Sequence, residues 1–325
     1  MSTPQPLSAA TPADLTSRPT LPDGVARLHH LGVILIEGED AGKFIHGQLT
    51  QDFSLIAPGE ARLAAFCNAK GRMLASFVGF KNLQGDIFLV CSRDLLAGTL
   101  KRLAMFVMRA KATLTDASEA YPVWGLAGSA TKKIAAGAEQ PWVKAELDAE
   151  SGPQTVVQLY PAGAVARQLL VARHQDTPPG DPLSESLWQW GEVQSGVATL
   201  SAPLVEAFVP QMLNYESVGG VNFKKGCYPG QEVVARSQFR GTLKRRTFLA
   251  HCSSALQAGQ EILADNDPEQ AAGRVVQAAP SPAGGYDALV ELQLSYQDAA
   301  LSVDGGGATS GLALMPLPYA LLEDL

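Results

Sequence analysis

Short apolar runs alternate with polar and glycine-rich breaks along most of the chain, which is the pattern of a protein with many β-strands. The two apolar halves of residues 61–80 flank a polar turn at 68–72 that contains Gly71, and this arrangement predicts a β-hairpin. Further strands are predicted at residues 31–38, 85–92, 110–116, 123–128, 155–160 and 167–173.

Two segments between these strands are predicted to form helices. Asp40 is placed to cap a helix through residues 41–51, and Asp94 is placed to cap one that reaches residues 103–105.

Two later helices have clearer ends. Asp181 followed by Pro182 predicts a helix start, and Gly196 predicts the end of the same helix. The stretch PGQEVVARSQFR opens on Pro229, which suits the first turn of a helix, and Gly241 follows it as a closing glycine.

The order of these elements predicts an α+β protein. Strands and helices up to residue 120 do not repeat as βαβ, and a second unit of similar composition follows. From residue 247 onward, short apolar pieces separated by turn clusters predict a small β-barrel or sandwich. We therefore divide the chain into a disordered tail rich in Pro, Ser and Thr, two α+β units and a β-rich unit, at residues 1–24, 25–120, 121–246 and 247–325.

The composition is that of a globular protein. The chain has 325 residues, of which 46% are hydrophobic and 18% charged, and its net charge of −7 argues against a protein that coats nucleic acid through bulk charge. The first 20 residues lack the apolar segment of a secretory signal. No apolar run approaches the roughly 20 residues that cross a bilayer. These features predict a cytoplasmic protein.

The common catalytic and metal-binding motifs are absent. No GxGxxG, HExxH or GxSxG occurs, which argues against a Rossmann dehydrogenase, a zincin and an α/β-hydrolase. The four cysteines include no CxxC pair, which excludes a local zinc knuckle and fits a reducing compartment. They are also too scattered for the usual ligands of a permanent iron–sulfur cluster, so no stably bound metal is expected.

One segment concentrates positive charge. Residues 224–246 hold seven Lys and Arg and one acid, Glu232, which gives +6 in a chain whose remainder is −13. A run of this kind is either a solvated helix face or a surface that holds phosphate, polyglutamate carboxylates or RNA.

Cys227 lies within this segment, directly before the predicted helix. The helix N-terminus and the neighbouring Lys224 and Lys225 both favour a thiolate over a thiol, which predicts a functional cysteine. The competing interpretation is a buried cysteine that acts as a small hydrophobe. That interpretation is preferred for the three cysteines in strand-like settings, Cys67, Cys91 and Cys252.

The run KGCYPGQE at residues 225–232 resembles the signature of the YgfZ-type folate-binding proteins. These proteins are relatives of the glycine-cleavage T-protein and are linked to the assembly and repair of iron–sulfur clusters. The stretches 208–246, 42–53 and 67–73 resemble further blocks of the same family, and they occur in the family's order.

The resemblance implies a fold and a ligand. The fold would be the T-protein cloverleaf, with two α+β units around a central folate pocket and a C-terminal β-barrel. The ligand would be tetrahydrofolate, with Gln194, Lys225 and Arg236 as expected folate contacts. Cys227 falls on the motif cysteine, and the motif residues carried over are Lys225, Gly226, Cys227, Tyr228, Gly230, Gln231 and Glu232.

The resemblance also bears on catalysis. The T-protein is an aminomethyltransferase that uses a carboxylate of its N-terminal hairpin, and the matching positions here are Ala75 and Ser76. Neither side chain exchanges a proton near pH 7, so classical aminomethyl transfer is not expected. Relatives often carry Glu where Gln194 stands, and an amide in that place keeps a hydrogen bond but no charge.

The sequence and the resemblance leave three possible functions. The first is a folate-binding factor that supports iron–sulfur clusters in client enzymes, including a tRNA methylthiotransferase, through Cys227. The second is a folate-dependent one-carbon transferase that uses another carboxylate. The third is an RNA-contacting factor of tRNA modification that works through residues 224–246. The expected partners are client proteins or the assembly machinery, the chain is taken as a monomer, and the identity of the clients and the chemical fate of Cys227 stay open.

Overall fold

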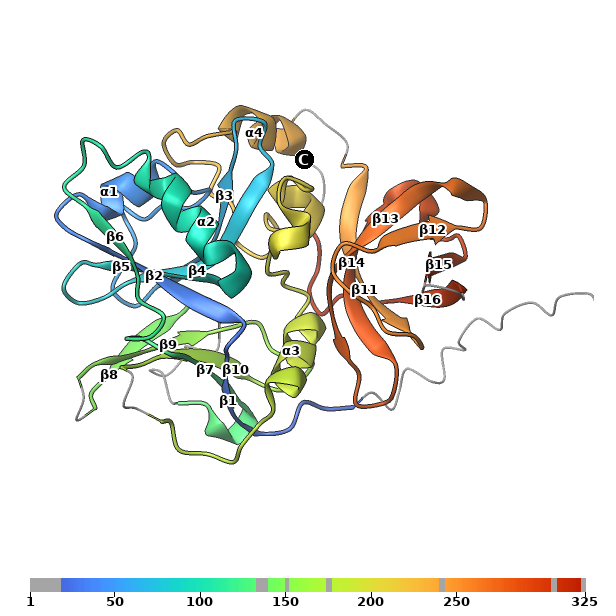
Figure 1. Cartoon of the computed structure of the whole chain (residues 1–325), viewed down its shortest axis with the longest axis horizontal. Helices are drawn as coiled ribbons and strands as arrows, with labels where there is room; N and C mark the ends of the chain where they lie inside the picture. Colours follow the sequence, from blue (N-terminus) through green and yellow to red (C-terminus); the bar gives the residue numbers. More distant parts are fainter. Residues whose placement is uncertain are drawn as a thin grey trace, which may run out of the picture.

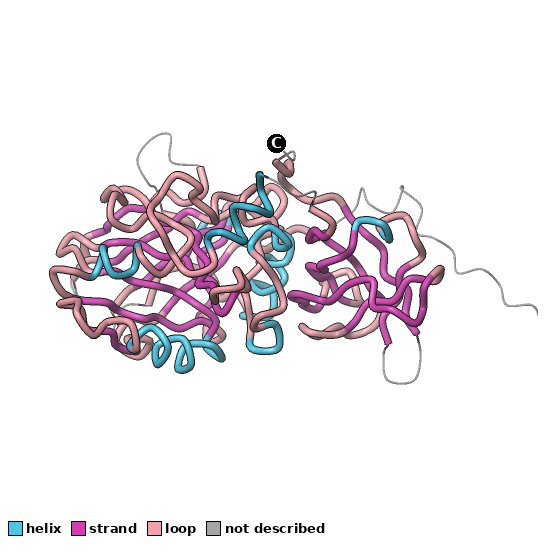
Figure 2. The backbone as a smooth tube through the Cα atoms, turned by 90° about the horizontal axis from the view of Figure 1, so that it is seen from above, coloured by secondary structure: helices cyan, strands magenta, loops and turns pink. Residues whose placement is uncertain are grey.

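The computed structural model describes residues 19–132, 140–149, 152–173, 177–239, 243–304 and 309–322. These residues form two five-stranded sheets and a closed barrel, with every strand pair antiparallel (Figure 1). Seen from above, the barrel is a lobe at one end of the molecule (Figure 2). The predicted α+β class is confirmed, and the open choice between barrel and sandwich is settled in favour of the barrel.

The first sheet has the strand order β3-β4-β5-β2-β6. Its hairpin is the predicted one, with Ala61 opposite Phe80 and a bulge before Cys67. Two helices accompany this sheet, α1 (Ala41–His46) and α2 (Arg93–Ala104). The strands are β2 (Leu31–Glu37), β3 (Ala61–Cys67), β4 (Met73–Lys81), β5 (Ile87–Ser92) and β6 (Thr113–Asp116).

The second sheet has the order β1-β7-β10-β9-β8. Strand β1 comes before the first sheet in the sequence, yet it pairs with β7, with Gly24 opposite Ala127. Leu21, in the stretch predicted as tail, is buried. The strands are β1 (Gly24–Arg27), β7 (Val123–Ala127), β8 (Lys144–Leu147), β9 (Gln154–Gln158) and β10 (Arg167–Val171).

Two further helices and the barrel complete the fold. Helix α3 (Glu185–Gln194) lies between the second sheet and the barrel and contacts β13, while α4 (Gln231–Phe239) follows the KGCYPGQE motif (Figure 1). The barrel closes in the order β11-β14-β13-β12-β15-β16. Its strands are β11 (Arg245–Cys252), β12 (Glu261–Ala264), β13 (Asp267–Pro280), β14 (Tyr286–Gln293), β15 (Leu301–Asp304) and β16 (Thr309–Met315).

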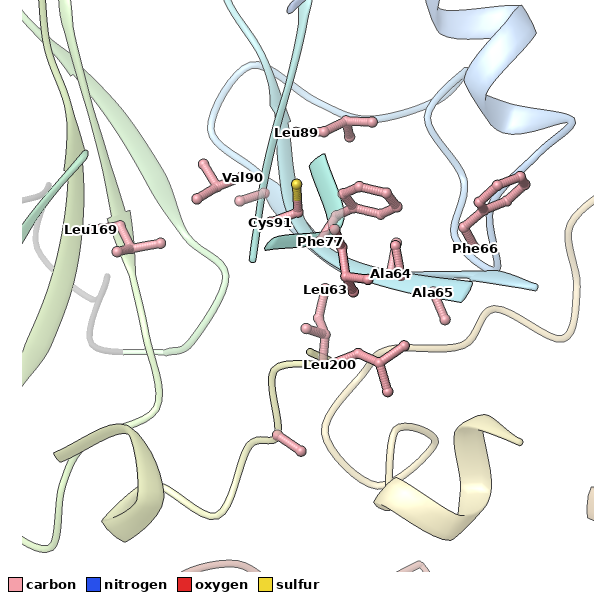
Figure 3. Packing of buried hydrophobic residues seen from close by; sticks show 14 of the residues in the cluster. Leu63, Ala64, Ala65, Phe66, Phe77, Leu89, Val90, Cys91, Leu169 and Leu200 are labelled. Atoms are coloured by element: carbon pink, nitrogen blue, oxygen red, sulfur yellow. The ribbon is translucent and has the colours of Figure 1, made fainter. Parts of the chain in front are cut away.

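The main hydrophobic core joins the two sheets. Leu63, Phe77 and Val90 of the first sheet and Leu169 of the second belong to one buried cluster (Figure 3). The barrel has a smaller core of its own, which includes Val275 and other side chains of its inner face. Burial of this kind is the main stabilising term, at about 25 cal/mol for each Å² of apolar surface removed from water.

Neither predicted acidic residue makes a cap hydrogen bond, although the predicted N-cap position of Asp40 is confirmed. Asp40 occupies the cap position of α1, but its carboxylate accepts the Lys111 amide at 2.8 Å and makes no cap bond. The helix also ends at His46 and does not reach residue 51, because the chain turns at Gly47. Asp94 lies inside the first turn of α2 rather than before it, and its carboxylate accepts the Ala202 amide at 2.9 Å.

The predicted start of α3 is also wrong, although its end is confirmed. The backbone at Asp181 pairs with β1, since the Val25 amide donates to its carbonyl at 2.8 Å. The helix therefore begins later, at Glu185, with the Ser184 side chain accepting the Leu187 amide at 3.2 Å. Gly196 follows the last turn in the left-handed region, at φ 73°.

Candidate functional site

A cavity lies between the two sheets. It encloses about 560 Å³ of space between atoms, solvent at its mouth included, and its walls come from β4, β5, β10, α3 and residues 195–199. Leu63, Phe77, Val90, Cys91 and Leu169 give it apolar sides (Figure 3). Apolar walls with a few buried polar groups are typical of a small-molecule site.

Helix α3 presents two different faces because side chains four residues apart lie one above the other. Trp188 and Glu192 share one face, and the Trp188 indole donates to Glu192 Oε1 at 3.0 Å. Trp190 and Gln194 share another face, and both donate to Asp287 Oδ2 of the barrel, at 2.7 and 2.9 Å. Glu192 lines the cavity, whereas Gln194, the expected folate contact, lines a different hollow beside the barrel.

Glu192 is held by a buried charge cluster. His30 Nε2 lies 3.1 Å from both of its oxygens, and His30 Nδ1 lies 2.7 Å from Glu185 Oε1. Burial alone would lower the pKa of His30, but the carboxylates of Glu192 and Glu185 outweigh it and raise the pKa to about 9. Burial would raise the pKa of Glu192, but the charge of His30 and that of Arg167 lower it. Both groups are therefore ionised at neutral pH.

Arg167, the first residue of β10, lies in the same cavity wall. Its side chain is 2% exposed, its Nη1 donates to the Gly191 carbonyl at 2.9 Å, and its guanidinium lies 4.5 Å from the centre of the Trp188 ring. Its Nε is buried without a hydrogen-bond partner among the residues that the structure describes. Burial lowers the pKa of Arg167 to about 10, which leaves the side chain charged at neutral pH.

The hairpin positions bring no carboxylate to this cavity. Ala75 and Ser76 are both buried on β4, and the Ser76 hydroxyl accepts the Leu200 amide at 2.8 Å. Within the described part of the chain, Glu192 is the carboxylate that lines the cavity.

The KGCYPGQE motif forms a second site, at the end of α1. Cys227 is exposed, whereas Cys67, Cys91 and Cys252 are buried, as predicted. Lys225 Nζ donates to the carbonyls of His46 and Leu49 at 2.6 and 3.0 Å and lies 4.6 Å from the centre of the Tyr228 ring. Burial lowers the pKa of Lys225 to about 8. Lys225 thus anchors the loop on α1 and turns Cys227 outward.

The glycines of two sequence blocks pack against each other. Gly230 has φ 81°, and a Cβ there would lie 2.4 Å from the Asn68 carbonyl oxygen at the hairpin tip. Gly71 has φ 71°, and a Cβ there would lie 3.0 Å from Val233 Cβ of α4. The prediction that Pro229 begins the helix is wrong, because Gly230 is in the left-handed region and α4 begins at Gln231.

The surroundings of Cys227 combine polar and apolar groups. His46 Nδ1 lies 3.0 Å from Asp52 Oδ1, and a Cβ built on Gly226 would lie 3.3 Å from His46 Nε2. Leu55, whose amide donates to Asp52, is 82% exposed. Nothing in the described ranges brings together three His, Cys, Asp or Glu side chains that could hold a metal ion.

The basic segment is not one continuous charged surface. Arg245 pairs with Glu291 and Arg246 with Glu216, and Arg246 is buried. On α4, Glu232 lies in the first turn as predicted and pairs with Arg236 at 2.6 Å. Arg236 and Lys225, the other two expected folate contacts, do not line the cavity between the sheets. The predicted helix end at Arg240 and Gly241 lies outside the described residues.

Two cavity residues, Arg167 and Glu192, and His30, the partner of Glu192, were missed by sequence reasoning. Nothing local marks His30 or Arg167, which come from distant parts of the chain. Glu192 carried a usable signal, because it stands four residues after Trp188 on the face opposite to that of Gln194.

The fold defines a class of protein. A structure of the glycine cleavage system aminomethyltransferase T from Bartonella henselae matches with a TM-score of 0.64 at 12% identity, over 94% of this chain and 88% of the other. The chain thus has the fold of the T-protein, as the sequence predicted. No family model matches it.

Relatives with known names narrow the class to a family. The tRNA-modifying protein YgfZ of Yersinia pseudotuberculosis is 30% identical over 324 residues, 94% of each chain, and that of Serratia proteamaculans is 29% identical over 318 residues, again 94% of each. The chain belongs to the YgfZ family. None of its described helices is long and apolar enough to cross a membrane.

Proposed function

We propose that this protein binds tetrahydrofolate in the cavity between its two sheets and supports the assembly or repair of iron–sulfur clusters in client enzymes of the cytoplasm. The clients would include tRNA-modifying enzymes, which agrees with the name that its relatives carry. Cys227 is the functional thiol of this proposal. The observation that carries it is an apolar cavity with a buried polar cluster, placed where the T-protein resemblance expects folate.

The residues of the cavity fit a folate. Trp142 and Tyr160 line it with ring centres 5.8 Å apart, which gives a flat heterocycle aromatic neighbours. Val90 and Leu169 provide apolar walls, and Arg167 provides a charged hydrogen-bond donor. The cavity residues replace Gln194, Lys225 and Arg236 as our proposed folate contacts.

The thiol and the cavity are separate in this proposal. Cys227 is exposed and does not line the cavity, so folate binding does not require its sulfur. Cys227 instead lies at the surface of the protein, where Leu55, whose amide donates to Asp52, and Phe239, which packs on Phe223 at 5.3 Å between ring centres, are also exposed. Such a surface suits contact with a client protein.

The two other functions receive less support from the geometry. A one-carbon transferase needs a carboxylate at the reacting centre, and both oxygens of Glu192 are occupied by donors from His30, Trp188 and Gln277. An RNA surface along residues 224–246 would need exposed charge, but Arg245 and Arg246 are paired with glutamates.

Anaerobic calorimetric titration of tetrahydrofolate tests the first half of the proposal. Wild type and Cys227→Ala are expected to bind equally, and Ala198→Phe, which fills the cavity, is expected to lose binding. Ala104→Phe, at an exposed site on α2, is the matched control and should bind as wild type does. Absence of binding to wild type would overturn the folate proposal.

Complementation tests the second half of the proposal, which is that Cys227 supports iron–sulfur enzymes. In cells that lack the protein, wild type and Cys252→Ala are expected to restore the activity of iron–sulfur enzymes, whereas Cys227→Ala is not. Cys252 is the control because it is buried in the barrel. Full restoration by Cys227→Ala would remove the thiol from the proposal.

A further inference from the structure

Arg167 has hydrogen-bonding capacity that the protein does not use. A guanidinium carries five N–H donors. Arg167 donates from Nη1 to the Gly191 carbonyl at 2.9 Å and more weakly to the Tyr160 carbonyl at 3.5 Å, while its Nε is buried with no partner among the described residues. A buried donor without a partner costs about 1–3 kcal/mol, so an acceptor brought by a ligand gains a large part of that energy.

Four other polar groups of the cavity wall already have hydrogen-bond partners within the protein. Glu192 accepts from three side chains through its two oxygens. The Trp142 indole donates to the Val218 carbonyl at 2.8 Å, and the Ser195 hydroxyl donates to the Glu192 carbonyl at 2.6 Å. Ser76 accepts the Leu200 amide. Arg167 differs from these groups because it keeps a buried donor that, among the described residues, is free to recognise a ligand.

The charge of the cluster indicates what kind of acceptor fits. Arg167 and His30 carry two positive charges, and Glu192 and Glu185 carry two negative charges, so the four groups sum to zero. A carboxylate added next to this balanced, buried cluster would be an uncompensated charge in a place of low dielectric. A neutral carbonyl acceptor leaves the balance intact.

We propose that Arg167 recognises the neutral carbonyl edge of the pterin ring and thereby selects a 4-oxo pterin over its 4-amino analogue. This inference rests on the proposed binding of folate in the cavity. The Trp188 ring, 4.5 Å from the guanidinium, and the Gly191 carbonyl hold the group in place. A 4-amino group offers a donor where Arg167 also offers donors, so the analogue leaves Arg167 unpaired and adds a repulsion.

Calorimetry with three ligands tests this inference on the whole protein. Wild type is expected to bind tetrahydrofolate and tetrahydropteroate, which lacks the glutamate, within about threefold of each other. It should bind the 4-amino analogue of tetrahydrofolate about 10- to 100-fold more weakly. Arg167→Gln is expected to lose most of this discrimination. Arg27→Gln is the matched control, because Arg27 also lies over an indole, that of Trp124 at 5.5 Å, but does not line the cavity.

The possible outcomes distinguish a failure of this inference from a failure of the proposed folate binding. No binding of tetrahydrofolate to wild type contradicts the proposed function. Equal binding of the 4-oxo and 4-amino ligands by wild type overturns the inference and leaves the function intact. The affinity of wild type could instead fall strongly from tetrahydrofolate to tetrahydropteroate, with no such fall in Arg167→Gln. That result would place the glutamate carboxylate on Arg167 and would also overturn the inference. If Arg167→Gln does not fold, the affinities of wild type for the 4-oxo and 4-amino ligands still test whether the site selects the 4-oxo pterin.

Discussion

Replacing Gly230 by alanine tests whether the motif and the hairpin tip form one structural unit. Gly230 has φ 81°, a conformation that costs a residue with a Cβ about 1–2 kcal/mol. The new Cβ would also lie 2.4 Å from the Asn68 carbonyl oxygen and 2.7 Å from Gly71 Cα, and both contacts are with backbone that cannot rotate away. The two terms together give an expected loss of about 3 kcal/mol.

Thermal unfolding followed by circular dichroism measures this loss. Gly230→Ala is expected to lower the midpoint by about 5 °C. Gly98→Ala is the matched control, because Gly98 is exposed in the middle of α2 and an added Cβ there meets nothing within 4 Å. That control should raise stability by about 0.5–1 kcal/mol. Equal midpoints for Gly230→Ala and wild type would refute the close packing of the two blocks.

Further predictions concern the charge cluster, the cysteines and a helix cap. The pKa of His30 is raised to about 9 from 6.5, so its contribution of about 3 kcal/mol is fully present below pH 6.5 and lost as the pH rises through 9. In urea unfolding, the free energy of unfolding of His30→Gln should not show this loss as the pH rises. If the pH profiles of His30→Gln and wild type run parallel, the loss does not come from His30. Iodoacetamide should modify the native protein once, at Cys227, and mass spectrometry that found several alkylated cysteines would show that the others are accessible. Ser184→Ala should lower the free energy of unfolding by about 1 kcal/mol through the lost cap of α3, and an unchanged value would show that the cap bond is weak.

The sequence predicted most of the strands, although not β1 and β8, because the signal of a strand is local. Alternation and apolar runs located the hairpin of β3 and β4 and the closely spaced strands of the barrel. The two acidic residues make no cap bonds because distant backbone amides bind their carboxylates: Asp40 accepts the Lys111 amide, 71 residues away, and Asp94 accepts the Ala202 amide, 108 residues away. Contacts between residues so far apart in the sequence leave no local sequence pattern from which they could be predicted.

The candidate site was predicted in part. The KGCYPGQE motif correctly marked an exposed cysteine beside a helix, since glycine, lysine and cysteine at this spacing form a local signal. Two arginines of the basic segment, Arg245 and Arg246, meet Glu291 and Glu216, which are 46 and 30 residues away, and the local charge pattern does not indicate these pairings. Residues two apart on a helix point in different directions, so Glu192 lines the cavity between the sheets and Gln194 lines the hollow beside the barrel.

A crystal structure of the protein with tetrahydrofolate, grown without oxygen, tests the central claim most directly. We expect the pterin between Val90 and Leu169, in the cavity of the two sheets, with a carbonyl at hydrogen-bond distance from Arg167. Cys227 should remain at the surface without contact to the ligand. A folate bound at the loop of Cys227, with the cavity empty, would contradict the account.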